Sequence, residues 1–133
     1  MQHQIEYDPQ SKVLIGTTSG MATVVGLCEY LGELADHPNL PECVGIISDH
    51  RKLDLADLGY LDVSAVAECA SEHADKWRDV KHPIVVRRHV DLGIPRLYEV
   101  VGGGSVGYRT QLCHSLDEAM TALAGRRSEQ VPT

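Results

Sequence analysis

The sequence predicts a single α/β domain whose mixed, mostly parallel β-sheet is covered by helices. The chain has 133 residues, which is the length of one domain. Short apolar runs alternate with stretches of helical periodicity, and strands separated by helices need crossover connections that make the strand pairs parallel. The first two predicted strands flank a tight turn and therefore form an antiparallel hairpin. We expect the domain to span residues 1–125 and a flexible tail to follow at 126–133.

The first elements are predicted by local patterns. Residues 5–7 and 13–18 flank the turn sequence Asp8-Pro9-Gln10-Ser11, which is typical of a hairpin. Apolar positions then recur with helical spacing over residues 24–35. Thr23 is a suitable N-cap for this helix, and the stretch 36–38 contains a proline that ends it.

A buried strand and a second helix are predicted next. The continuous apolar run at 44–48 is typical of a strand that is buried on both faces. Residues 49–59 look irregular, with one helical turn near 55–58. Asp62 is the expected cap of a helix whose core positions are Val63, Val66, Ala67, Ala70, Ala74 and Trp77. Pro83 marks a boundary, and a second buried strand is expected at 84–86.

In the last third of the chain, some segments fit more than one type of secondary structure. Residues 93–101 fit either a short helix or a strand, whereas 106–113 alternates well enough for a final or edge strand. The sequence Ser115-Leu116-Asp117-Glu118 is a capping box that begins the last helix. Gly125 is the expected stop of that helix.

Composition limits the class of protein. A net charge of −7 argues against nucleic acid, whose binding depends on Lys and Arg. No uncharged apolar run approaches the length of a membrane span, and the first 15 residues do not resemble a secretion signal. We therefore expect a cytoplasmic protein whose four widely separated cysteines are free and mostly buried.

Charge is distributed unevenly along the chain. Residues 27–75 carry eleven acidic side chains against Arg51 and Lys52, a net charge of −9, whereas residues 76–96 carry a net charge of +4. We interpret these stretches as two oppositely charged surfaces of one domain. The alternative is a basic patch that binds an anionic ligand or an acidic partner.

The sequence motifs favour neither catalysis nor metal binding. The glycine run at 102–107 fits both G-x-G-x-x-G and G-x-S-x-G, but the strand-like residues after it provide no helix N-terminus. Cys69 and His73 have the i, i+4 spacing of two metal ligands, but no further ligands follow a recognisable pattern. His82 and His89 are explained as single exposed histidines. We expect no metal and no cofactor.

Candidate ligand-binding residues lie where parallel strands are predicted to end, because ligand sites gather at the carboxyl ends of such strands. The segments concerned are 48–51 and 87–91, and the candidates are Asp49, Arg51, Arg87, Arg88 and Arg96. They predict a small pocket for an apolar or anionic ligand. Asp49 is the carboxylate best placed for acid–base work, so an enzyme that uses Asp49 or a cysteine is a further alternative.

Several segments form a pattern that spans nearly the whole chain. They are the hairpin at 5–18 followed by Ser19-Gly20, the triplet Asp49-His50-Arg51, the stretch Leu92-Gly93-Ile94-Pro95-Arg96-Leu97-Tyr98-Glu99, and Ser115-Leu116-Asp117-Glu118-Ala119. This pattern resembles the SpoIIAA-like group of STAS-type domains, which is also likened to the lipid-binding CRAL-TRIO fold. The resemblance implies that 93–101 is a helix, that the protein is cytoplasmic, and that it binds rather than catalyses.

Some STAS-type domains are phosphorylated on a serine that follows an aspartate at the start of a helix. Here Val63 follows Asp62, and Ser64 comes one position later, so modification of Ser64 stays open. The leading hypothesis is a non-enzymatic binding or regulatory module that contacts a protein partner or itself, and we expect a homodimer. The helices at 24–35 and 63–77 are the candidate docking faces. Trp77 is either the anchor of that interface or a core residue.

Overall fold

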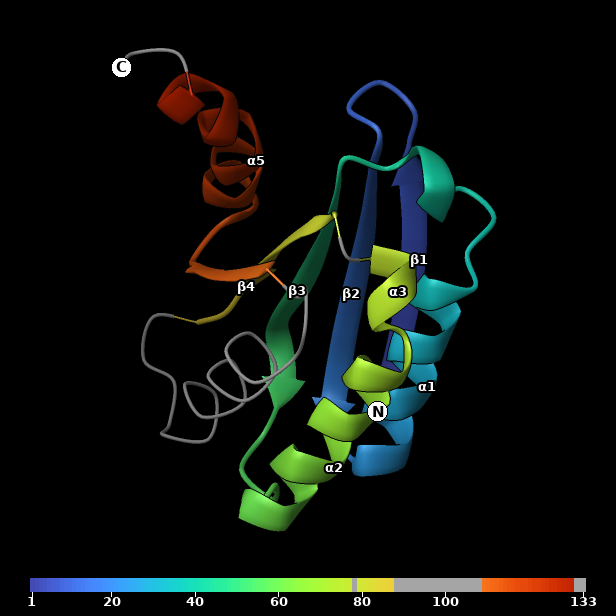
Figure 1. The fold of residues 1–133 in the computed structure, drawn as a ribbon. Helices are drawn as coiled ribbons and strands as arrows, with labels where there is room; N and C mark the ends of the chain where they lie inside the picture. Colours follow the sequence, from blue (N-terminus) through green and yellow to red (C-terminus); the bar gives the residue numbers. More distant parts are fainter. Residues whose placement is uncertain (78, 88–108, 131–133) are drawn as a thin grey trace.

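Five strands form one mixed sheet within the computed structural model, which describes residues 1–77, 79–87 and 109–130 (Figure 1). The strands lie in the order β1-β2-β3-β4-β5, with β1 antiparallel to β2 and each later pair parallel. Helices α1 and α2 cover one face of the sheet, and α5 packs against the other (Figure 1). The predicted fold class is confirmed: the chain is an α/β domain with an N-terminal hairpin and an otherwise parallel sheet.

The hairpin consists of β1 (Gln2–Asp8) and β2 (Val13–Met21), as predicted. The carboxylate of Asp8 closes the turn by accepting hydrogen bonds from the backbone N–H of Gln10, at 3.0 Å, and from the hydroxyl of Ser11, at 2.7 Å. Lys12 completes the turn in a left-handed conformation, with φ of 58°. The turn sequence therefore fixes the register of the two strands.

Helix α1 (Val24–Ala35) matches its prediction at both ends. The Thr23 hydroxyl caps it by accepting a hydrogen bond from the N–H of Gly26 at 2.9 Å, and Asp36 ends it. Its apolar stripe, which includes Leu27, Leu31 and Leu34, is buried against the sheet. A short 3-10 helix, η1 (Leu40–Glu42), follows in the loop that leads to β3.

Strand β3 (Gly45–Asp54) is twice as long as the predicted strand at 44–48. The expectation of irregular structure from residue 49 onward was wrong for 49–54. These residues stay extended because β2 is long, and its last residues pair with them up to Met21 opposite Asp54. Residues 55–58 then form one hydrogen-bonded turn, in which the N–H of Leu58 donates to the carbonyl of Leu55.

The second helical region consists of α2 (Tyr60–Glu72) and α3 (Ala74–Trp77), separated at His73. The helix begins earlier than predicted, because Gly59 rather than Asp62 is its N-cap. The Asp62 carboxylate lies in the first turn and accepts a hydrogen bond from the N–H of Gly59 at 2.8 Å. It therefore stabilises the helix start from inside the helix.

Strand β4 (Lys81–Val85) contains Pro83, which was predicted to mark a boundary before the strand. Pro83 lies opposite Gln111 of β5 (Arg109–Cys113). On its other side, β4 pairs with β3 at Lys81 and again from Ile84 onward. A proline has no N–H to donate, so the strand tolerates it where one side of the ladder is interrupted. The ambiguous segment 93–101 and the glycine run 102–107 lie outside the described residues.

Helix α5 (Leu116–Gln130) begins at the predicted capping box. The Ser115 hydroxyl accepts a hydrogen bond from the N–H of Glu118 at 3.0 Å, and the Glu118 carboxylate accepts one from the N–H of His114 at 3.4 Å. The predicted end at Gly125 was wrong, because the helix continues to Gln130. A glycine inside a helix costs only about 1 kcal/mol, which does not by itself end one.

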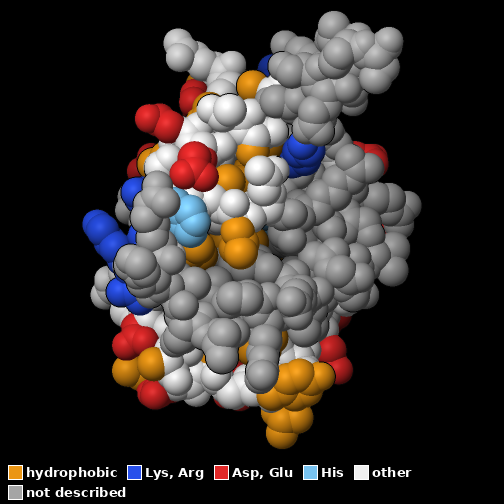
Figure 2. All heavy atoms as spheres, turned by 90° about the vertical axis from the view of Figure 1, so that its left-hand side faces the viewer, with side chains coloured by type: hydrophobic (Ala, Val, Ile, Leu, Met, Phe, Trp, Pro, Cys, Tyr) orange, Lys and Arg blue, Asp and Glu red, His pale blue; other side chains and the backbone are white. Residues whose placement is uncertain are grey.

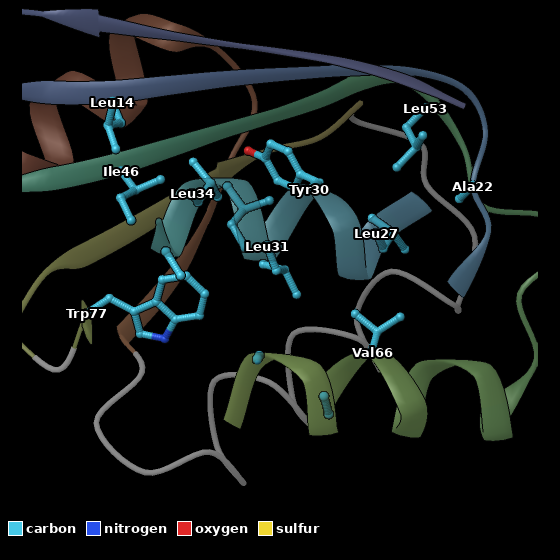
Figure 3. Packing of buried hydrophobic residues seen from close by; sticks show 14 of the residues in the cluster. Leu14, Ala22, Leu27, Tyr30, Leu31, Leu34, Ile46, Leu53, Val66 and Trp77 are labelled. Atoms are coloured by element: carbon cyan, nitrogen blue, oxygen red, sulfur yellow. The ribbon is translucent and has the colours of Figure 1, made fainter. Parts of the chain in front are cut away.

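The sheet separates two hydrophobic clusters. The larger cluster lies between the sheet and α1, α2 and α3, and Figure 3 shows its side chains from α1 and from the strands meeting in one layer. The smaller cluster lies under α5 and contains Val13, Ile47, Val85, Cys113 and Ala119. Because strand side chains alternate between faces, β3 contributes Ile46 to the first cluster and Ile47 to the second.

Candidate functional site

The predicted ligand residues Asp49 and Arg51 contact each other. The Arg51 guanidinium donates two hydrogen bonds to the Asp49 carboxylate, from Nε to Oδ1 at 2.9 Å and from Nη2 to Oδ2 at 2.8 Å, and the Arg51 backbone N–H adds a third at 3.2 Å. Burial alone would raise the pKa of the Asp49 carboxyl, but the hydrogen bonds and charge of Arg51 hold that pKa below its usual value. Both groups are therefore already engaged with one another.

Of the other three predicted ligand residues, the structure describes only Arg87. Asp49 and Arg51 lie in the middle of β3 rather than at its carboxyl end, because the strand runs on to Asp54. Arg87 follows β4 and is exposed to solvent. Arg88 and Arg96 lie outside the described residues.

Trp77 lies in the core rather than on the surface. Its side chain is 2% exposed and packs in the larger hydrophobic cluster, beside Leu34 in Figure 3. The imidazole ring of His73 contacts its ring edge-on, with centroids 5.6 Å apart. Of the two roles predicted for Trp77, the structure therefore supports the core role.

A buried chain of polar side chains crosses the centre of the same cluster, where the sequence suggested none. The Tyr30 hydroxyl of α1 shares a hydrogen bond of 2.6 Å with the Ser48 hydroxyl of β3, which is 2.5 Å from Nε2 of His82 on β4. Gly16 of β2 makes room for the tyrosine ring, because a Cβ at that position would collide with it. His82 is 3% exposed, so its interpretation as an exposed histidine was wrong.

His50 makes a second buried polar contact next to this chain. Its Nδ1 lies 2.7 Å from the Thr18 hydroxyl, and its ring meets the Tyr30 ring edge-on at 6.0 Å. Burial lowers the pKa of His50 to about 4 and that of His82 to about 3. Both rings are therefore neutral at physiological pH, and they act as hydrogen-bonding core residues.

Cys28 and Cys69 form a disulfide that ties α1 to α2, with their Cα atoms 5.7 Å apart. The prediction of free thiols was wrong for these two residues, and it is confirmed for Cys43 and Cys113. Cys28 and Cys69 are 41 positions apart in the sequence, and only the packing of the two helices brings them together, so the pairing was not predictable from the sequence. Stable disulfides are typical of oxidising compartments, so cysteine usage does not support the predicted cytoplasmic location.

An open groove of about 540 Å³ lies between β1 and α1. Strand β1 contributes His3, Gln4 and Ile5; α1 and the residues after it contribute Glu29, Gly32, Glu33, Asp36, His37 and Pro38. A Cβ at Gly32 would meet nothing within 4 Å, so the glycine leaves the groove open without being required by packing. The outer side of β1 faces this groove with no strand beside it in the described part of the chain.

The groove is acidic. Glu29, Glu33 and Asp36 follow one another at i, i+4 and i+7 and so form one stripe on the exposed side of α1. Glu33 contacts Nε2 of His3 at 2.8 Å across the groove, and Asp36 accepts a hydrogen bond from the Lys76 ammonium at 2.7 Å. None of the residues that line the groove is a lysine or an arginine. Its electrostatic field therefore favours a cationic group.

A second exposed feature is an apolar tip at the start of α2. Tyr60 and Leu61 are 65% and 81% exposed. Hydrophobic side chains stand out at the lower end of the molecule in Figure 2, which is the end where α2 begins in Figure 1.

No group of three or more His, Cys, Asp or Glu side chains within the described ranges could hold a metal ion. In the same ranges, no helix combines the length and the apolar character needed to cross a membrane. No protein-family model matches the chain, and no curated protein matches its sequence. The resemblance to STAS-type domains therefore stays a prediction from the sequence segments quoted above.

Sequence reasoning identified one close pair, Asp49 and Arg51, and missed the groove. The acidic stripe could have been predicted from the sequence, because Glu29 and Glu33 have the spacing of one helix face within the strongly acidic stretch at 27–75. The position of β1 beside that stripe could not be predicted, because it depends on the order of the strands in the sheet.

Proposed function

We propose that this protein is a non-enzymatic binding module that recognises a protein partner through the groove between β1 and α1. The observation that carries the proposal is the groove itself, which joins an edge strand, an acidic helix stripe and an unfilled position at Gly32. Edge strands beside helices are a recurrent site of peptide recognition. The resemblance to STAS-type domains implies the same class of function.

The buried polar side chains support binding rather than catalysis. Tyr30, Ser48 and His82 bond to one another beneath α1, and Asp49 is engaged by Arg51. A catalytic group must reach a substrate atom, whereas these groups are directed at other side chains. They therefore fit a role in holding α1 and the strands in position.

Selection from a random peptide library displayed on phage tests the proposal. The wild-type protein is the bait, and the matched bait is Gly32→Leu, whose side chain would project into the groove and obstruct it. We expect enriched peptides that bind the wild type and lose binding to Gly32→Leu. Recovery of no peptide, or of peptides that bind both baits equally, would contradict the proposal.

Gly32→Ala serves as the control, because a methyl group fits the open position and leaves most of the groove free. We expect peptides selected on the wild type to bind Gly32→Ala with unchanged affinity.

A further inference from the structure

We infer that the partner segment is an extended, basic peptide that adds to β1 as a sixth strand, with Lys or Arg at alternate positions toward α1. This inference rests on the proposed function and specifies its partner. It follows from three properties of the groove: the backbone of β1, the spacing of the acidic stripe, and the net charge of the site.

The backbone of β1 offers the hydrogen bonds that an added strand needs. In an antiparallel pair, alternate residues direct their N–H and C=O groups toward the partner strand and the others direct them away. Strand β1 spans seven residues, from Gln2 to Asp8, and pairs only with β2 in the described part of the chain. Its outward N–H and C=O groups are thus a template for another extended segment.

The acidic stripe matches the repeat of such a segment. Glu29 and Glu33 are four residues apart on a helix, so they are separated by about 6 Å along its axis. Side chains on one face of a strand repeat every two residues, or about 6.6 Å. A peptide of the pattern Lys-x-Lys therefore places its two ammonium groups opposite these two glutamates.

The charges favour a foreign segment over a second copy of this chain. A second copy would place its own β1 in the groove, and that strand carries Glu6 and Asp8 but no lysine or arginine. Its α1 would also bring a second stripe of carboxylates toward the first. Like charges in close contact oppose association, whereas a basic peptide is attracted to the site.

The first test uses three synthetic heptapeptides as fluorescent probes in anisotropy titrations. The sequence Ser-Lys-Val-Lys-Val-Lys-Ser carries the alternating pattern, Ser-Lys-Lys-Lys-Val-Val-Ser has the same composition without alternation, and Ser-Glu-Val-Glu-Val-Glu-Ser reverses the charge. We expect the alternating peptide to bind about tenfold more tightly than the block peptide and the acidic peptide not to bind. Equal binding of both basic peptides would overturn the inference.

Charge-reversal variants locate the site. The double variant Glu29→Lys with Glu33→Lys should bind the alternating peptide about tenfold or more weakly, because two exposed charge attractions become repulsions. Glu68→Lys with Glu72→Lys is the matched control, since these exposed glutamates of α2 have the same i, i+4 spacing away from the groove. An equal loss in both variants would show attraction to overall charge and would overturn the inference.

Backbone methylation tests strand addition separately from charge. Two versions of the alternating peptide carry N-methyl groups on opposite sets of alternate amides, so that only one set removes the N–H groups directed at β1. We expect one version to lose about tenfold or more in affinity and the other to bind as the parent does. Equal affinity of the two versions would overturn strand addition.

The two proposals fail in different ways. If the phage selection yields groove-dependent peptides that have no basic alternation, the protein-binding function stands and this inference is wrong. If the selection yields no groove-dependent peptide, the proposed function fails, and the strand-addition model fails with it.

Discussion

The polar groups on the two sides of α1 differ in burial and in how far their hydrogen-bonding atoms are already engaged. On the inner side, Tyr30 bonds to Ser48, which contacts His82, and all three side chains are buried. On the outer side, Glu29 and Glu33 line an open groove beside a strand edge. The inner polar groups have used their hydrogen-bonding capacity to fix the core, whereas the outer groups and the β1 backbone have capacity left. Recognition by this domain is therefore expected on the outer side of α1.

The largest expected effect concerns the disulfide, which holds the inner side together. Replacing both Cys28 and Cys69 by serine should lower the free energy of unfolding by about 4 kcal/mol, because the link closes a loop of about 40 residues in the unfolded chain. Urea denaturation measures this change. The groove lies on the other side of α1, so peptide affinity should be kept while the variant is folded. A loss of binding in the folded variant would show that the two sides are coupled.

The next effect concerns the space under Tyr30. A Cβ at Gly16 would come within 2.6 Å of the tyrosine ring carbon Cε1, and the ring is buried on all sides. Gly16→Ala should therefore lower the free energy of unfolding by about 3 kcal/mol, in the range of overpacked cores. Thermal unfolding of this variant checks the expectation. An unchanged midpoint would mean that the core around Tyr30 is loosely packed.

The buried histidines make stability depend on pH. Burial lowers the pKa of His50 to about 4 and that of His82 to about 3, below the value of about 6.5 expected in the unfolded chain. The unfolded state therefore binds more protons, so stability is full above about pH 6.5 and falls as the pH drops below that value. Urea denaturation across this range measures the slope.

His82→Gln is the matched variant for the pH experiment, because a glutamine amide can hydrogen-bond to Ser48 but does not titrate. We expect this substitution to reduce the slope by about half. A wild-type stability that does not change between about pH 7 and pH 5 would contradict the assignment of neutral, buried rings.

The smallest expected effect is a gain in stability from a substitution on the outer side of α1. Gly32→Ala should raise the free energy of unfolding by up to about 1 kcal/mol, because alanine favours the helix and the added methyl group meets nothing within 4 Å. Differential scanning calorimetry measures this increase. A decrease would mean that the position is packed in solution and that the groove is closed.

Local signals predicted the elements that depend on local contacts. Thr23 predicted where α1 begins and the stretch 36–38 predicted where it ends, and the sequence from Asp8 to Ser11 predicted the hairpin. The extension of β3 to Asp54 was not predictable in this way, because those polar residues are held extended by their pairing with β2. Helix α5 passed Gly125 because one unfavourable residue does not end a helix.

The candidate site was less predictable than the fold. Asp49 and Arg51 are two residues apart, so their contact was within reach of the sequence. The contact of Ser48 with His82 and the bond between Cys28 and Cys69 each join separate elements, and they depend on how those elements pack. The groove likewise needs β1 at the sheet edge and α1 beside it. Long-range arrangement, rather than residue type, was the missing information.

The most direct test of the binding account is a titration of the alternating basic heptapeptide into ¹⁵N-labelled protein, followed by NMR. The account predicts that the amide signals of β1 and of the outer side of α1 shift together, from Gln2 to Asp8 and at Glu29, Gly32 and Glu33, while those around Asp49 and Arg51 do not move. Shifts centred on Tyr60 and Leu61, or on the Asp49–Arg51 pair, would contradict it.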